Sequence, residues 1–123
     1  MFLALLLEPV ESLSSSSVLE AYYDEEAKFD EWRPSDDDVS WVYSPEGWEV
    51  VGPDVNEIYL ASGALLDLGD LDVLDAKQCE RFGVWLGTRL NKPVPKHLQA
   101  FYLKALEMAK KASELGSALI VEF

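Results

Sequence analysis

Apolar residues at helical spacing between residues 75 and 90 constrain the fold of this chain more than any other feature. Cys79, Phe82 and Leu86 recur every three to four positions, as on the buried side of an amphipathic helix. Asp75, with Gln78 three positions later, has the pattern of an N-terminal helix cap. The expected apolar face comprises Cys79, Phe82, Gly83, Leu86 and Leu90. Gly83 on that face would let another element approach closely.

A second helix follows directly. The segment Asn91-Lys92-Pro93 breaks the first helix, Pro95 suits the first turn of the next one, and Gly116 suits its C-terminal end. The apolar face of this helix is expected to comprise Leu98, Phe101, Tyr102, Ala105, Ala109 and Ala112. These two helices are the clearest periodic elements of the sequence.

Short apolar runs at both ends of the chain predict strands over residues 2–8 and 118–123. A helix over residues 11–29 is indicated by apolar residues on one side, and Ser17 with Glu20 three positions later forms a candidate cap. The apolar run at the start is too short for a membrane span and has no preceding base and no cleavage site. Together with a single cysteine, this favours a cytoplasmic protein without a membrane-bound part.

The sequence of the middle of the chain predicts further β-strands. Residues 39–43 and 48–51 are β-rich and flank Ser44-Pro45-Glu46-Gly47, so we expect a β-hairpin there. Residues 57–68 fit a further strand, although a helix also fits this short apolar run. With 49% hydrophobic residues the chain can bury a real core. We therefore expect one α+β domain over residues 1–123, with an antiparallel or mixed sheet of about 4–5 strands and 2–3 helices packed on it.

The net charge of −13 is unevenly distributed. Residues 1–75 contain 19 acidic residues against Lys28 and Arg33, a charge of −17, whereas residues 76–123 contain four acidic and eight basic residues, a charge of +4. The acidic part repels phosphate backbones, which argues against direct nucleic-acid binding. The same field would attract a basic protein. Acidity that serves only solubility remains an equal alternative.

The densest acidic stretch runs from Asp24 to Asp38, where eight of fifteen residues are acidic but Phe29 and Trp32 lie among them. We expect a surface loop in which carboxylates steer a partner and aromatic rings anchor it. Trp41 and Trp48 extend this aromatic region, although core packing is the better explanation for either one alone, whereas for Trp32 the two explanations are equal. The predicted partner-binding residues are Asp24, Glu25, Glu26, Phe29, Asp30, Glu31, Trp32, Asp36, Asp37, Asp38, Trp41 and Trp48.

No catalytic, cofactor or metal motif accompanies this stretch. The single histidine, His97, is expected to face solvent on a helix, and no G-x-S-x-G elbow or phosphate-binding glycine loop is present. The aspartates at 67, 70, 72 and 75 lack the spacing of a calcium loop, and consecutive side chains at 36–38 converge poorly on an ion. Cys79 is expected in the core. The sequence therefore predicts a protein that is not an enzyme and holds no cofactor or metal.

In its acidic 24–38 block, its aromatic region, its lone Cys79 and its compact α+β pattern, the chain resembles the small immunity proteins of bacterial polymorphic-toxin and contact-dependent growth inhibition systems. This resemblance implies a non-enzymatic inhibitor that neutralises a cognate toxin, often a basic nuclease. Two alternatives remain open. One is a nucleic-acid mimic that blocks a DNA-binding protein, and the other is a small enzyme or ligand-binding domain with an unrecognised site.

Overall fold

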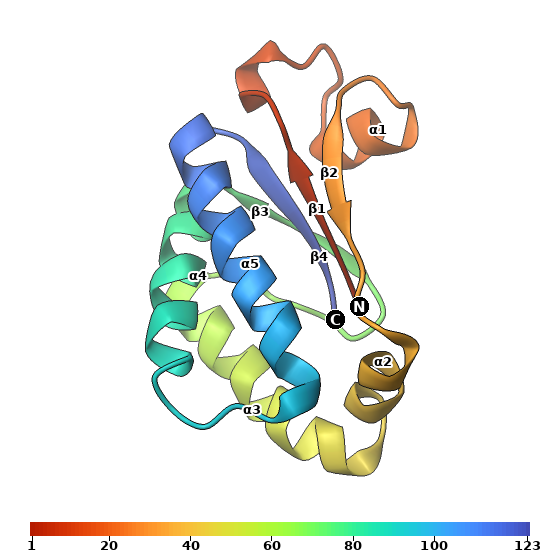
Figure 1. The fold of residues 1–123 in the computed structure, drawn as a ribbon. Helices are drawn as coiled ribbons and strands as arrows, with labels where there is room; N and C mark the ends of the chain where they lie inside the picture. The colour runs from red at the N-terminus through yellow and green to blue at the C-terminus, as the bar shows by residue number, and fades with distance from the viewer.

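The first and last strands of the chain lie side by side at the centre of a four-stranded antiparallel sheet (Figure 1). The computed structural model describes all 123 residues. Strand β1 (Phe2–Leu6) pairs with β4 (Ala118–Glu122), whereas β2 (Phe29–Trp32) and β3 (Leu71–Asp75) form the two edges. The strand order is β2-β1-β4-β3, and the predicted α+β class is confirmed.

The central strands are buried on both faces, which explains their unbroken apolar sequences. Leu3 lies opposite Val121 on one face, and Ala4 lies opposite Ile120 on the other. Leu3 and Val121 join the large hydrophobic core that contains residues of the C-terminal helices. Ala4 and Ile120 form a smaller cluster under the first helix of the chain. Strand residues alternate between faces, so both sides of the sheet are covered.

Five α-helices and one 3-10 turn complete the fold, more helices than the two or three that we expected. The two C-terminal helices lie together on one face of the sheet (Figure 1). In chain order these elements are η1 (Val10–Ser12), α1 (Val18–Tyr23), α2 (Asp36–Val42), α3 (Pro45–Ser62), α4 (Ala76–Arg89) and α5 (Lys96–Leu115).

The two predicted C-terminal helices are confirmed as α4 and α5. The predicted apolar face of α4 is buried except for Leu90, which is partly buried, and the six predicted residues of α5 are all buried. Asp75 forms a complete capping box, because its side chain accepts the N–H of Gln78 and the Gln78 side chain accepts that of Asp75. Gly116 ends α5 in the left-handed conformation, with φ at 63°. Pro95 stands just before α5 rather than in its first turn.

The predicted β-hairpin is wrong, since residues 39–43 and 48–51 belong to α2 and α3 or to the short link between them. The Ser-Pro-Glu-Gly connector is a helix start. The side chain of Ser44 accepts the N–H of Gly47 at 3.1 Å, and Pro45 occupies the first turn, where its missing N–H costs nothing. The helical spacing of Val51 and Ile58 is obscured in the sequence, because the position between them on the buried face is an aspartate.

Residues 57–68 are also not a strand. Helix α3 continues to Ser62 and stops at Gly63, whose φ of 75° is left-handed, and an irregular segment follows. The strand lies further on, as β3, which the sequence analysis missed. Its aspartates break the apolar pattern on which strand prediction depends.

The helix predicted over residues 11–29 is much shorter than expected. Only Val18–Tyr23 is α-helical, although the Ser17 cap is confirmed by its side chain, which accepts the N–H of Glu20 at 3.1 Å. Nor is the acidic stretch of residues 24–38 a continuous loop. It contains all of β2 and the first turn of α2. Five of its eight acids therefore lie on regular structure, and Asp24, Glu25 and Glu26 lie in the turn before β2.

Candidate protein-binding surface

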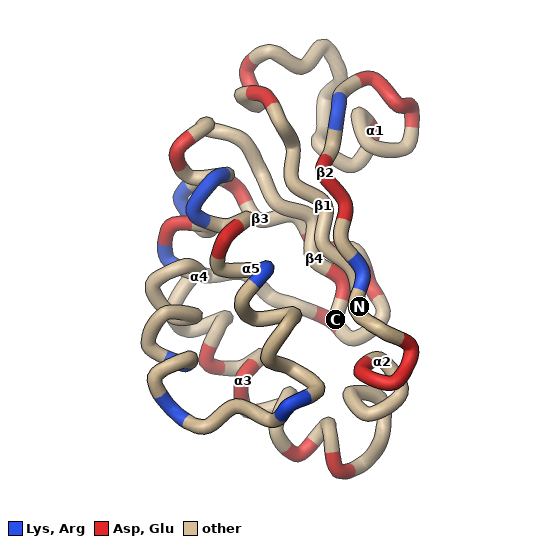
Figure 2. The backbone as a smooth tube through the Cα atoms, viewed as in Figure 1, with Lys and Arg blue, Asp and Glu red and all other residues tan.

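The predicted acidic residues divide between an edge strand and a helix start. Asp30 and Glu31 are exposed on β2, and Asp36 and Asp37 are exposed in the first turn of α2. Figure 2 shows acidic residues along the turn before β2, on β2 itself and at the start of α2. We define these four carboxylates as the β2–α2 acidic surface.

The helix start explains why three consecutive aspartates are tolerated. The Ser35 side chain accepts the N–H of Asp38 at 3.2 Å and caps α2. The unpaired N–H groups of the first turn carry partial positive charge, and an acidic side chain there stabilises a helix by about 0.3–1 kcal/mol. Asp36 and Asp37 therefore remain at the surface at little cost to the fold.

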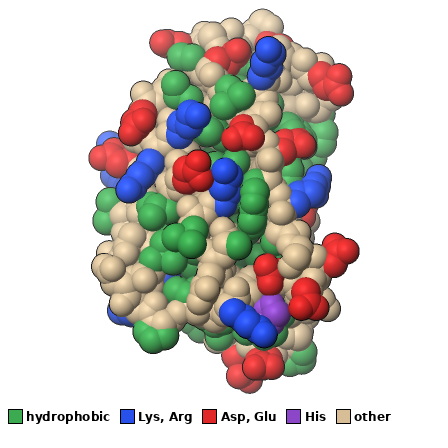
Figure 3. Space-filling model, in the orientation of Figure 1, with side chains coloured by type: hydrophobic (Ala, Val, Ile, Leu, Met, Phe, Trp, Pro, Cys, Tyr) green, Lys and Arg blue, Asp and Glu red, His purple; other side chains and the backbone are tan.

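Asp38 has a different environment from its two neighbours. Its Oδ1 atom lies 2.9 Å from Nδ1 of His97, and both side chains are largely buried. The His97 ring stacks on Trp41, with ring centroids 5.2 Å apart and an angle of 23° between the planes. His97 is thus not a solvent-facing residue, contrary to expectation. In Figure 3 both acidic and basic side chains lie against this histidine.

The two aromatic residues of the acidic stretch lie on opposite faces of the sheet, because alternate residues of a strand point in opposite directions. Trp32 lies beside Leu3, packs against the main core and has its ring centroid 6.0 Å from that of Phe101. Phe29 is half-buried on the other face and meets Tyr22 edge to face at 5.1 Å. Both aromatic side chains therefore pack within the protein. Their place among exposed acids in the sequence is explained in part by the strand, whose two middle residues, Asp30 and Glu31, are exposed.

The turn that precedes β2 holds the remaining predicted acids. Asp24 and Glu25 are exposed, and Glu25 has a φ of 53°. Glu26 is exposed but accepts hydrogen bonds from the backbone and side chains of Ser14 and Ser15. These bonds, first that of the Ser14 hydroxyl, lower the pKa of Glu26. Glu26 thus fastens the segment before α1 to this turn.

Trp48 is the most exposed of the predicted tryptophans, with 41% of its surface accessible. It lies on α3, where Glu46 and Glu49 are also exposed. Its ring covers Gly52, one turn further along the same helix. The start of α3 therefore adds an exposed aromatic side chain and two more carboxylates to the acidic part of the molecule.

The β2–α2 acidic surface is not neutralised from within the protein. The ion pairs of the structure are Met1–Glu122, Arg89–Asp54, His97–Asp38 and Lys104–Glu107. None includes Asp30, Glu31, Asp36 or Asp37. Most basic residues lie instead on α4 and α5 and the link between them (Figure 2). Most of the basic charge is therefore carried by α4 and α5, although Lys96 at the start of α5 lines a hollow together with Asp37 and Glu46.

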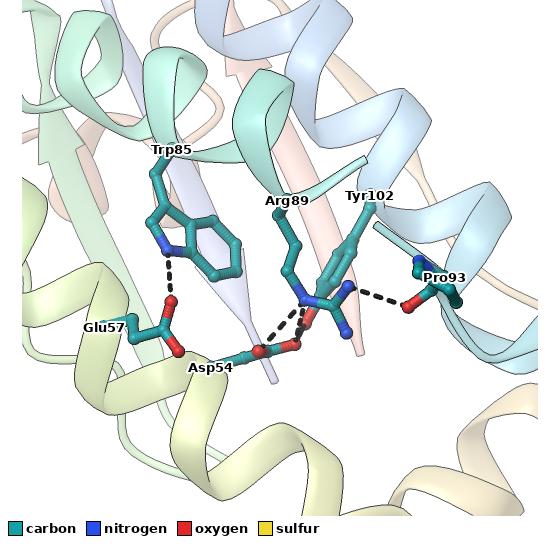
Figure 4. A network of polar contacts seen from close by, with 6 residues as sticks. All are labelled: Asp54, Glu57, Trp85, Arg89, Pro93 and Tyr102. Carbon is teal, nitrogen blue, oxygen red and sulfur yellow. Dashed lines mark hydrogen bonds and ion pairs between the residues drawn. The ribbon is translucent and has the colours of Figure 1, made fainter. Parts of the chain in front are cut away.

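A second polar cluster, which the sequence analysis missed, joins α3, α4 and α5 (Figure 4). Asp54 is 5% exposed, and both of its carboxylate oxygens lie 3.2 Å from Nε of Arg89. The hydroxyl of Tyr102 donates to Asp54 at 2.6 Å, and Arg89 donates to the carbonyl oxygen of Pro93 at 3.0 Å. Burial and the adjacent carboxylate raise the pKa of Tyr102.

This cluster is fully satisfied. No buried side-chain nitrogen or oxygen in the molecule lacks a hydrogen-bond partner. Glu57, one turn after Asp54, accepts a hydrogen bond from the indole N–H of Trp85 at 3.2 Å. The arrangement joins three helices and leaves no group directed at a ligand. Its only sequence signal is an aspartate at the spacing of buried apolar residues.

The other side chains that could take part in catalysis or metal binding are either buried or not clustered. Cys79 is fully buried, and burial raises the pKa of its thiol to about 12. No group of three or more histidine, cysteine, aspartate or glutamate side chains lies in position to hold a metal ion. No helix has both the length and the apolar character required to cross a membrane.

Comparison of the chain with protein-family models, with curated proteins and with solved structures gives no match.

Proposed function

We propose that this protein is a non-enzymatic inhibitor that binds a basic protein partner through the β2–α2 acidic surface. The observation that supports this proposal is that four exposed carboxylates, on two regular elements, have no basic partner within the molecule. Unpaired charges of one sign attract an oppositely charged surface over about 10 Å at moderate ionic strength. They raise the rate of association more than the final affinity.

Attachment to regular structure favours recognition over a purely solubilising role. The carboxylates of a mobile tail would attract any cation, whereas those on β2 and α2 keep a fixed spacing and present a defined pattern to a partner. Trp48 and Tyr23, which are 41% and 66% exposed, are two large aromatic side chains that lie next to acidic residues in the chain. Exposed aromatics of this kind are frequent hot spots of protein interfaces.

By its resemblance to immunity proteins, the chain is proposed to act in the bacterial cytoplasm on a cognate toxin. A toxin that acts on RNA or DNA carries a basic surface for phosphates. An acidic protein that covers this surface would compete with the nucleic acid. Inhibition then requires only tight binding and no chemistry by the inhibitor.

The test is a binding comparison with the partner captured from the native cell. The variant Asp30→Asn/Asp36→Asn/Asp37→Asn removes three carboxylates from the acidic surface. We expect the association rate to fall by about tenfold and its dependence on salt to weaken, because electrostatic steering acts on the encounter. Surface kinetics at two salt concentrations measure both effects.

A charge-matched control separates location from net charge. The variant Glu11→Gln/Asp67→Asn/Asp70→Asn removes three exposed carboxylates from other parts of the molecule. It should associate at nearly the wild-type rate. Equal association rates for both triple variants would show that only total charge matters, and the proposed surface would then be rejected.

A further inference from the structure

A hollow of about 470 Å³ lies on the sheet face that α1 covers, between α1 and the edge strand β2. Figure 1 shows α1 beside β2, and Figure 2 shows acidic residues in the turn that joins them. The hollow is lined by Tyr22, Tyr23, Glu25, Ala27, Phe29 and Glu31. Rings and carboxylates are therefore its main chemical groups, and no basic residue lines it.

The aromatic wall of the hollow is ordered by mutual contacts. Tyr22 meets Phe29 at a centroid distance of 5.1 Å and Tyr23 at 5.6 Å, in both cases edge to face. Tyr23 is nevertheless 66% exposed, the largest exposed fraction of any aromatic side chain in the molecule. The negative face of an aromatic ring attracts a cation placed over it.

The acidic groups of the hollow are available to a ligand. The hydroxyl of Tyr22 donates a hydrogen bond to Oε1 of Glu31, whereas Oε2 of Glu31 has no partner. Glu25 is exposed and forms neither an ion pair nor a side-chain hydrogen bond. A cation in the hollow would therefore meet two carboxylates that form no ion pair within this protein.

The same aromatic cluster already binds one guanidinium group. The central carbon of the Arg33 guanidinium lies 4.5 Å from the centroid of the Phe2 ring. Phe2 in turn lies 6.0 Å from Tyr22. An arginine of this chain thus covers one end of the cluster, while the Tyr23 end carries no cation.

The open edge of β2 offers a way to deliver such a cation. The N–H of Leu7 donates to the carbonyl oxygen of Lys28 at 3.1 Å, which fixes the alternation of hydrogen bonds along the strand pair. Asp30 therefore directs its backbone groups towards β1, and Phe29 and Glu31 direct theirs away from the sheet. An added strand would place a residue opposite Glu31 with its side chain on the face that holds the hollow.

We infer that this hollow receives an arginine side chain from an extended segment of the partner that pairs along the open edge of β2. Arginine suits it better than lysine, because a planar guanidinium both stacks on a ring and binds a carboxylate through two N–H groups. A second copy of this chain does not suit the edge, because pairing two β2 strands brings Asp30 and Glu31 close to their equivalents. This inference rests on the proposed function and specifies the chemistry of the partner.

A peptide titration tests the inference without the natural partner. The probe is acetyl-Thr-Val-Arg-Val-Thr-amide, added to the isotopically labelled protein and followed by nuclear magnetic resonance. A contact of this size is expected to have a Kd of about 1 mM. The backbone amide signals of Glu25, Phe29 and Glu31 should shift, and hydrogen exchange at the amides of Phe29 and Glu31 should slow as the edge becomes paired.

Two comparisons establish the chemistry. A peptide with neutral citrulline in place of arginine should bind the wild-type protein about tenfold more weakly. The arginine peptide should bind the Glu31→Gln variant about tenfold more weakly too. A charge-assisted contact is lost in each case. The variant Asp36→Asn/Asp37→Asn changes acids outside the hollow and should bind nearly as wild type. Equal binding of both peptides, shifts confined to other elements, or no shift at about 10 mM peptide would each overturn the inference.

The captured partner distinguishes failure of this inference from failure of the proposed function. If Asp30→Asn/Asp36→Asn/Asp37→Asn weakens binding but Tyr23→Ala/Glu25→Gln/Glu31→Gln does not, the acidic surface binds the partner and the hollow is not used. If neither triple variant weakens binding, the proposed function itself is wrong. Loss of binding in the hollow variant, with an unchanged melting temperature, supports the inference.

Discussion

Nδ1 of His97 in the first turn of α5 lies 2.9 Å from Oδ1 of Asp38 in the first turn of α2. This contact links two helix starts that are 59 residues apart in the chain. It also gives Asp38 a structural role that its two neighbours lack. The three consecutive aspartates therefore divide into one that holds the fold and two that face solvent.

The Asp38–His97 contact should be measurable as a coupling energy. We expect His97→Ala to lower the free energy of unfolding by about 1 kcal/mol. In a double-mutant cycle with Asp38→Asn, the two residues should show a coupling of about 0.5–1.5 kcal/mol, because each loses the same partner. Urea denaturation of the four proteins measures this. Strictly additive effects would mean that the contact contributes nothing.

The buried Asp54 should be far more sensitive than the neighbouring Glu57. Asp54→Ala leaves the Arg89 guanidinium and the Tyr102 hydroxyl without their partner, and we expect a loss of about 3–5 kcal/mol in unfolding free energy. Glu57→Gln keeps an acceptor for the Trp85 indole at an exposed position and should change stability by less than about 0.5 kcal/mol. Chemical denaturation tests both, and comparable losses would contradict the described arrangement.

Replacement by alanine should affect mainly stability at Trp32 and mainly partner binding at Trp48. Trp32 packs on the core beside Phe101, so Trp32→Ala should cost about 1–2 kcal/mol of stability. Trp48→Ala removes an exposed ring and should cost less than about 0.5 kcal/mol, while it speeds dissociation of a bound partner. For comparison, Phe101→Ala should cost about 3–5 kcal/mol. Thermal unfolding and surface kinetics separate the two tryptophans.

Two glycines provide a matched pair of substitutions. A Cβ at Gly47 would overlap the carbonyl oxygen of Trp41, so Gly47→Ala should destabilise the protein by about 1–3 kcal/mol. A Cβ at Gly87 meets nothing within 4 Å, and Gly87→Ala should stabilise helix α4 by up to about 1 kcal/mol. Melting temperatures that move in the same direction for both variants would contradict the close approach of the Trp41 carbonyl group to Gly47.

Alkaline pH should weaken the contact between α1 and β2. The hydrogen bond to Glu31, together with burial, raises the pKa of Tyr22 from 10.0 to about 12. The folded protein therefore holds this proton more tightly than the unfolded chain, and the resulting stability is complete below pH 10 and lost as the pH rises towards 12. Tyr22→Phe should remove this part of the pH dependence. If the hydrogen bond were absent, the free energy of unfolding would depend on pH in the same way for the wild type and for Tyr22→Phe between pH 10 and about 12.

Sequence patterns were sufficient to predict a helix or strand wherever its buried positions are occupied by apolar residues. The apolar faces of α4 and α5 contain almost no interruption, and Asp75 and Gly116 mark helix ends by local chemistry alone. The terminal strands were equally clear, since both of their faces are buried. Prediction of these elements required no knowledge of contacts between residues far apart in the chain.

The middle of the chain could not be assigned because its decisive interactions are polar or distant. Asp54 occupies a core position through Arg89 and Tyr102, which lie 35 and 48 residues away, and so conceals the helical period of α3. Trp32 is partly buried against Phe101, a neighbour only in the folded state. The hollow beside β2 depends on Tyr22, whose contacts with Phe29 and Glu31 no local pattern reveals.

The central position of β4 has a consequence for how the chain reaches its native state. β4 is the last strand along the chain and pairs with β1, the first, as well as with β3. Contacts between the two ends of a chain slow folding, because a long loop must close before they form. During synthesis β1 must therefore remain without one of its partners until the final strand has emerged. A shortened product without β4 would expose unpaired, apolar strand edges that are prone to aggregate.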